Sequence, residues 1–177
     1  MLTSCVKQDY STCSAGNIIC NLNDYVTGVE VGMDSNGRKN RDGHQMENLV
    51  ESYLKKTGLP YTKEVPMTTI RNDWGVTLTA DFVQNKRWDF AVKTDQNIYL
   101  IETNFYTSGG SKLNETARSY KLIAEEAKNI DGFTFVWITD GKGWTSAKHD
   151  LRETFTVLDT LYNISDMEAG IFISLLR

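Results

Sequence analysis

Apolar residues recur every three to four positions in three stretches of the chain, and this spacing predicts three amphipathic helices. The first covers residues 45–57 and ends at Gly58, since glycine favours helix ends. The second covers residues 112 to about 128 and has Ser111 as its N-cap. The third covers residues 147 to about 162. The buried stripe of the second helix is predicted to be Leu113, Ala117, Tyr120, Ala124 and Ala127.

Strand-like runs lie between these helices. Residues 76–83 and 87–92 are separated by a short turn, which favours an antiparallel hairpin, and residues 98–105 extend it to a three-stranded meander. The continuous apolar run at 133–139 is typical of a strand buried on both faces. The last apolar stretch, 170–175, fits a short strand or a short helix. The order helix, three antiparallel strands, helix, strand, helix predicts an α/β (α+β) fold with helices covering a mixed central sheet.

The polar segments add less. Residues 31–45 are rich in Gly, Asn and Asp and predict a loop, in which Arg38, Lys39 and Arg41 form a basic patch. That patch is either a solvated surface or a contact to phosphate. Residues 1–30 give only a weak structural signal. Because no repeat, linker or low-complexity segment interrupts the chain, we expect one domain over residues 1–177.

Composition narrows the class of protein. Apolar residues make up 40% and charged residues 24%, as in soluble globular proteins, and no membrane span or secretory signal is visible. The net charge of −4 argues against polyanion binding over the whole surface, although a local basic surface remains compatible with it. Three cysteines without an export signal favour free thiols, and their spacing is poor for zinc.

Two carboxylates fall on neighbouring predicted strands. Alternation puts Asp89 on the opposite face from Trp88, Phe90 and Val92, and it puts Glu102 beside Asn104 on one face of the next strand. A buried carboxylate needs a cation, a hydrogen-bond donor or access to water. Asp89 and Glu102 therefore predict a site for Mg²⁺, which prefers one or two carboxylates plus water and phosphate oxygens. The alternative is a pair of satisfied acids at strand ends.

A glycine-containing loop, residues 107–110, leads into the second helix, and Lys112, Asn114, Glu115 and Arg118 lie at the helix start. Free backbone N–H groups at a helix N-terminus attract anions such as phosphate. A cation site followed by a phosphate site predicts a metal-dependent nuclease, because phosphodiester hydrolysis needs a cation to polarise the phosphate and to activate water.

The segments IETNFYTSGGSKLNETARSYK, FTFVWITDGKGW and LRETFTVLDTLYNI resemble the MboI- and DpnII-type restriction endonucleases, whose target is GATC. The loop SNGRKNRDG before MENLVESYL is similar to that family too, and the likeness covers roughly residues 34–166. It implies the PD-(D/E)xK nuclease fold with an αβββαβ core, Mg²⁺ as cofactor, double-stranded DNA as substrate, a homodimer and a cytoplasmic location in a prokaryotic cell. Family members are longer at the N-terminus, so the chain resembles their catalytic portion.

The resemblance also implies roles for single residues. Asp89 and Glu102 become metal ligands. Glu47 becomes an accessory acid, whereas its position in the first helix alone favours an acid that complements the helix dipole. In the wider fold the residue two after the second acid is usually Lys, and here it is Asn104. An amide orients a water but takes no proton from it. Either Lys112 or a second cation then supplies the missing positive charge.

Reading of the DNA is expected to use basic and amide side chains, since Arg and Lys suit guanine and Asn suits adenine, with phosphate contact the commoner use. The candidates are Arg38, Lys39, Arg41, Ser111, Lys112, Asn114, Arg118 and Lys142. Two other hypotheses remain open from the residues: a repair or junction nuclease of the same fold, and a DNA-binding fragment that does not cleave.

Overall fold

The computed structural model describes the backbone of residues 35–176 and the side chains of residues 44–176. The predictions for residues 1–34, including the three cysteines, lie outside the described residues. The strands are β1 (Tyr61–Pro66), β2 (Arg87–Lys93), β3 (Ile98–Phe105), β4 (Phe133–Asp140) and β5 (Leu161–Tyr162). The helices are α2 (Ser35–Thr57), α3 (Met67–Trp74), α4 (Ser111–Ala127), α5 (Lys148–Val157), α6 (Ile164–Glu168) and α7 (Ile171–Leu175), with 3₁₀ turns η2 (Asp81–Val83) and η3 (Lys142–Ser146).

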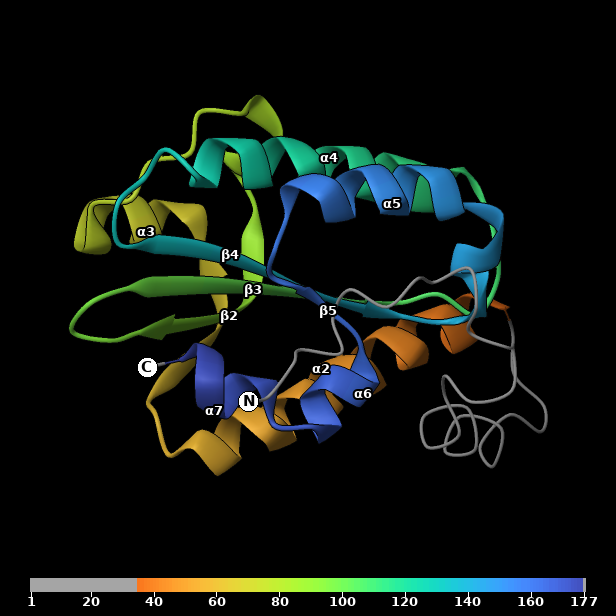
Figure 1. Ribbon diagram of the computed structural model, residues 1–177, viewed down its shortest axis with the longest axis horizontal. Coiled ribbons are helices and arrows are strands. Elements are labelled where there is room, and N and C mark those ends of the chain that lie inside the picture. The colour runs from red at the N-terminus through yellow and green to blue at the C-terminus, as the bar shows by residue number, and fades with distance from the viewer. Residues whose placement is uncertain (1–34, 177) are drawn as a thin grey trace.

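The five strands form one mixed sheet in the order β1-β2-β3-β4-β5. The pairs β1–β2 and β2–β3 are antiparallel, whereas β3–β4 and β4–β5 are parallel. Figure 1 shows α4 and α5 covering one face of the sheet, while α2, α6 and α7 lie against the other. The predicted α/β class and the αβββαβ order of the core are therefore confirmed. Among the helices of residues 35–176, none is both long and apolar enough to cross a membrane.

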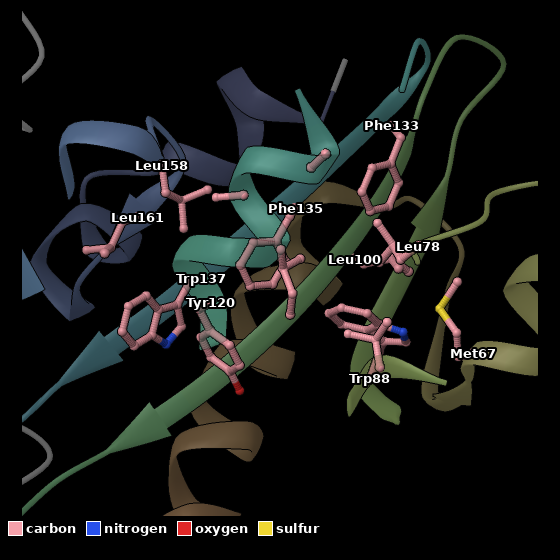
Figure 2. Close-up of a cluster of buried hydrophobic side chains, with 14 of the residues drawn as sticks. Met67, Leu78, Trp88, Leu100, Tyr120, Phe133, Phe135, Trp137, Leu158 and Leu161 are labelled. Atoms are coloured by element: carbon pink, nitrogen blue, oxygen red, sulfur yellow. The ribbon is translucent and has the colours of Figure 1, made fainter. Parts of the chain in front are cut away.

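The sheet separates two apolar cores. On the α4 side, edge-to-face ring contacts run through Trp88, Phe135, Tyr120 and Trp137, with centroids 4.9–5.8 Å apart (Figure 2). Aromatic pairs prefer such edge-to-face geometry. On the α2 side, the buried stripe of the first helix packs against alternate residues of β2, β3 and β4. The five residues predicted for the buried stripe of the second helix are all buried.

Alternation along β2 fails at one residue. Phe90 and Val92 lie in the α2-side core as predicted, but Trp88 lies with Ala91 in the α4-side core. The prediction that Trp88 shares a face with Phe90 and Val92 is therefore wrong. The departure occurs at Asp89, where the regular ladder between β2 and β3 stops.

The first strand of the meander was predicted in the wrong place. Residues 76–83 form no strand: Val76 and Leu78 are buried in alternation, yet the backbone N–H groups of Thr79 and Ala80 donate to the Glu126 carboxylate instead of a neighbouring strand. The partner of β2 is β1, a mostly exposed edge strand with little apolar pattern. An edge strand needs only one buried residue, here Val65, and so gives a weak signal in the sequence.

Two helix boundaries also differ, and one open alternative is decided in favour of a helix. The predicted loop at 31–45 is helical from Ser35 onward, because a helix propagates readily once its packed part has formed, even through glycine at a cost of up to about 1 kcal/mol each. The predicted helix 147–162 ends at Val157, since Leu158 is extended and Leu161 and Tyr162 pair with β4. The stretch 170–175 is helical, as α7.

Candidate active site

The site is built where β2 and β3 part. Their ladder runs from the pair Lys93–Ile98 to the pair Phe90–Ile101. The next pair in register, Asp89 and Glu102, does not continue it. Instead the backbone N–H and the hydroxyl of Thr103 donate to Oδ2 of Asp89, at 2.7 and 2.9 Å. A side-chain carboxylate thus replaces a strand partner, and this fixes its position.

The charge of Asp89 also acts on Glu47 of α2. Burial raises the pKa of Glu47, and the Asp89 charge raises that pKa further, because like charges disfavour ionisation. Nδ1 of His44 lies 3.7 Å from Oε2 of Glu47 on the solvent side. Burial likewise raises the pKa of Asp89, against the lowering effect of the two Thr103 hydrogen bonds. Two carboxylates that repel each other form an electrostatic site for a cation.

Glu102 is the most deeply buried acid of the site. It is 3% exposed and faces α4, on the same side of the sheet as Ile98 and Leu100. Oε2 accepts hydrogen bonds from Nζ of Lys86 at 2.7 Å and from the hydroxyl of Tyr120 at 2.5 Å. Among the described residues, the buried Oε1 atom has no hydrogen-bond partner. Burial, and next the Asp89 charge, raise the pKa of Glu102 to about 7.

The carboxylate oxygens of these acids are suitable ligands for a divalent cation. A buried oxygen without a partner is costly unless a ligand or ion completes it. Glu102 Oε1 is such an oxygen, and the charges of Asp89 and Glu102 interact strongly enough to raise the Glu102 pKa. Glu47 is coupled to Asp89 in the same way. The Asp89 charge thus acts on both Glu102 and Glu47, and the role of the three acids as metal ligands stays a prediction.

Lys86 was missed by sequence reasoning. It was read as part of the turn before β2, where lysine is common on the surface. In the structure its side chain is only 19% exposed and its Nζ contacts Glu102, 16 residues further along the chain. The ammonium also lies 5.3 Å from the Trp88 ring centroid and 5.4 Å from that of Tyr120. The available signal was a lysine three residues before Asp89 of β2. Such a spacing is too common in sequences to indicate a site by itself.

Asn104 and Lys112 occupy different surroundings. Oδ1 of Asn104 accepts from Nε1 of Trp137 at 2.9 Å, on the same face as Glu102. Lys112 is exposed in the first turn of α4. The N-cap of α4 is Gly110, not Ser111, and it makes no side-chain capping bond. The predicted N-cap is thus wrong by one residue, while the assignment of Asn104 and Lys112 to the chemistry remains a prediction.

Glycines hold the loop before α4 against the turn that follows β4. The backbone N–H of Gly143 donates to the carbonyl of Tyr106 at 2.8 Å. A Cβ on Gly141 or Gly143 would collide with the backbone of Tyr106 or Ser108, and Gly141 has φ 120°. Only glycine allows this approach. As a result the turn carrying Lys142 lies beside the loop that leads into α4.

The remaining DNA-binding candidates fall on α4 and α2. Asn114 and Arg118 line a surface pocket of about 420 Å³ together with Ser111, and exposed Phe82 and Leu122 contribute to its wall. Nη2 of Arg118 lies 3.7 Å from Oδ1 of Asp150. The backbone of α2 carries Arg38, Lys39 and Arg41, whose side chains lie outside the described residues.

Comparison with known proteins shows the family to which the chain belongs. A family model described as DpnII restriction endonuclease matches residues 13–173. The chain belongs to the DpnII restriction endonuclease family. The resemblance stated from the sequence is thereby confirmed.

Three relatives of the DpnII family illustrate the likeness. The chain is 55% identical over 162 residues to the type II restriction enzyme DpnII of Streptococcus pneumoniae, covering 88% of this chain and 56% of that protein. It is 47% identical to MboI of Moraxella bovis, with 82% and 50% covered, and 45% identical to MjaIII of Methanocaldococcus jannaschii, with 86% and 55% covered. The chain thus spans about half the length of these enzymes. No solved structure matches it.

Proposed function

We propose that this member of the DpnII family is a Mg²⁺-dependent type II restriction endonuclease that cuts double-stranded DNA at GATC in the cytoplasm of a prokaryotic cell. The observation that carries the proposal is the buried Oε1 atom of Glu102, which has no partner among the described residues and lies in the charge field of Asp89. The target sequence rests on the resemblance to the MboI and DpnII type.

Asp89, Glu102 and Glu47 are proposed to hold the cation. When bound, Mg²⁺ polarises a phosphate oxygen and lowers the pKa of a coordinated water. The chain's own residues prepare the site: Thr103 fixes the Asp89 carboxylate with two hydrogen bonds, and Trp137 fixes the Asn104 amide. In this proposal Asn104 orients the attacking water, and exposed Lys112 contacts a DNA phosphate.

DNA binding is proposed to use the start of α4 with the neighbouring turns. Free N–H groups at the start of a 17-residue helix favour a phosphate. Lys142 lies in the turn that the glycine contacts hold against the loop before α4, and Lys112 lies in the first turn of that helix. The remaining residues proposed for phosphate or base contact are Ser111, Asn114, Arg118, Arg38, Lys39 and Arg41. Because GATC is palindromic, a homodimer with a two-fold axis is the matching assembly.

Plasmid digestion tests the proposal. DNA with unmethylated GATC sites is incubated with the protein and Mg²⁺, and parallel reactions contain a chelator or a plasmid whose GATC sites have been removed. The expected result is a set of discrete fragments that map to GATC and vanish in both controls. Random degradation, or cutting that persists in chelator, would contradict the proposal.

A second candidate function is DNA binding without cleavage. One observation favours it: position 104 carries a neutral amide, which takes no proton from water. Electrophoretic mobility shift with a GATC duplex and Ca²⁺ separates the candidates. Saturable duplex binding together with no cleavage in Mg²⁺ or Mn²⁺ would select the binding fragment.

A further inference from the structure

Lys86 and Tyr120 hold the same oxygen of Glu102. The two donors come from separate elements, one from the turn before β2 and the other from the middle of α4. Both reach Oε2, at 2.7 and 2.5 Å, and leave Oε1 buried without a partner among the described residues. This asymmetry restricts rotation of the carboxylate, because turning it would break two hydrogen bonds at once.

The backbone around Lys86 is fixed as firmly as its side chain. Its N–H donates to the carbonyl of Val83 at 3.0 Å, and its carbonyl accepts from the N–H of Met67 at 2.9 Å. The ammonium then lies near the faces of the Trp88 and Tyr120 rings, which favour a cation. A long, flexible side chain held at both ends is ordered before any ligand arrives.

The hydroxyl of Tyr120 is positioned with equal precision. The ring packs edge-to-face on Phe135 and Trp137, with centroids 5.4 and 4.9 Å away (Figure 2). Tyr120 is 7% exposed, so its hydroxyl has few alternatives to the carboxylate. Buried phenolic O–H groups generally find such a partner.

From this geometry we infer that Lys86 and Tyr120 are positioning residues: together they form a clamp on Oε2 of Glu102 that keeps Oε1 free for the divalent cation. Lys86 in addition provides the positive charge next to the two acids that the neutral Asn104 does not carry. The inference rests on the proposed nuclease function for its meaning, but its metal-binding part is testable without cleavage.

Partners that orient a metal ligand typically change metal affinity or activity by about 10- to 100-fold when removed. Tyr120→Phe deletes one donor and keeps the ring and the charge. Calorimetric titration of the DNA-free protein with Mn²⁺ is expected to show about 10-fold weaker binding in this variant. Tyr106→Phe is the matched control, since the Tyr106 hydroxyl also bonds to a partner on α4, Thr116, but touches no carboxylate. Its Mn²⁺ affinity should equal that of the unaltered protein.

The role of Lys86 is tested by removing its positive charge in one variant and restoring a positive charge in another. Lys86→Met is expected to lower the cleavage rate at saturating DNA and Mg²⁺ by about 100-fold, and Lys86→Arg should recover at least a tenth of the original rate. Lys93→Met, on the exposed far end of β2, should cut normally. Thermal unfolding of each variant is recorded alongside.

The outcomes are distinct. Equal Mn²⁺ affinity in Tyr120→Phe and Tyr106→Phe, or no Mn²⁺ binding by the unaltered protein, overturns the clamp. Equal loss of rate in Lys86→Met and Lys86→Arg, with equal loss of thermal stability, reduces Lys86 to a structural residue. An unaltered protein that binds Mn²⁺ but does not cut refutes the nuclease proposal, while the Mn²⁺ comparison still decides the clamp.

Discussion

The parallel neighbours β3 and β4 each carry one buried carboxylate towards their C-terminal ends, and the two acids have opposite surroundings. Glu102 is 3% exposed and Asp140 is 5% exposed. Oδ1 of Asp140 accepts from the N–H of Gly141 at 2.7 Å, and Oδ2 accepts from the N–H of Ile164 at 3.2 Å. Within the described part of the chain, Glu102 is hydrogen-bonded only through Oε2, by two side chains.

The difference teaches that burial alone does not identify a functional acid. Burial raises the pKa of both groups, to about 6 for Asp140 and about 7 for Glu102. Asp140 uses both of its oxygens to hold backbone, at the start of the loop after β4 and at the start of α6, so its role is structural. Glu102 has one oxygen, Oε1, without a partner among the described residues, and the charge of Asp89 acts on it. The arrangement of partners, rather than depth, separates the two.

The largest expected effect comes from exchanging each acid for its amide. Glu102→Gln should lower cleavage by at least about 1,000-fold, or roughly 4 kcal/mol of transition-state stabilisation, because an amide is a poor ligand for Mg²⁺. Asp140→Asn is the matched control and should cut at nearly the original rate wherever it is folded. Single-turnover cleavage of a GATC duplex measures both. Full activity of Glu102→Gln would remove Glu102 from the site.

A second test uses pH without any metal. The pKa of Glu102 is raised in the folded protein from its usual 4.5 to about 7, so the folded state binds the proton more tightly than the unfolded state. The free energy of unfolding should therefore fall as pH rises from about 4.5 to about 7, by up to roughly 3 kcal/mol. Urea unfolding between pH 5 and 8 measures it.

Asp140 contributes in the same direction only up to about pH 6, because its pKa is raised less. The comparison is therefore sharpest between pH 6 and 7. There Glu102→Gln should show a shallower fall in unfolding free energy than the unaltered protein. Identical slopes in this window would contradict the assignment of a raised pKa to Glu102.

The third effect is on stability. In Asp140→Asn the amide nitrogen must face one of two backbone N–H donors, leaving that donor unsatisfied. Removing one partner of a buried hydrogen bond costs about 2 kcal/mol. Urea unfolding at pH 7 should show this loss. The change should be much smaller in Glu102→Gln, because the amide oxygen of Gln can accept the two hydrogen bonds that Oε2 accepts in Glu102. A loss below about 0.5 kcal/mol would mean that the backbone relaxes around Asp140.

Sequence reasoning succeeded where the pattern is local and regular. Along β3, strict alternation predicted that Glu102 and Asn104 share a face, and the structure confirms this because β3 is a central strand with neighbours on both sides. The later elements of the core, β2, β3, α4 and β4, were predictable from the same kind of local pattern, whereas its first strand was not.

It failed where distant contacts override the local pattern. Residues 76–83 alternate like a strand but give their N–H groups to Glu126. Trp88 changes face because the ladder stops at Asp89. Lys86 looked like a turn residue, since nothing local indicates that its ammonium reaches Glu102. The chemistry of an acid depends on such partners, so a sequence predicts which acids matter better than it predicts what tunes them.

The smallest effect probes the other acid of the pair on β2 and β3. Thr103→Val removes the hydroxyl donor to Oδ2 of Asp89 and retains the backbone N–H donor. One charge-assisted hydrogen bond of two is lost, so we expect stability to fall by about 1 kcal/mol and cleavage by roughly 3- to 10-fold. Thr134→Val, which removes a hydroxyl partner of Asn97 at the distant end of β4, is the control and should affect stability alone. If both variants cut equally well, the backbone N–H of Thr103 is sufficient to position Asp89. Of the two acids, only Glu102 would then depend on side-chain hydrogen-bond donors for its position.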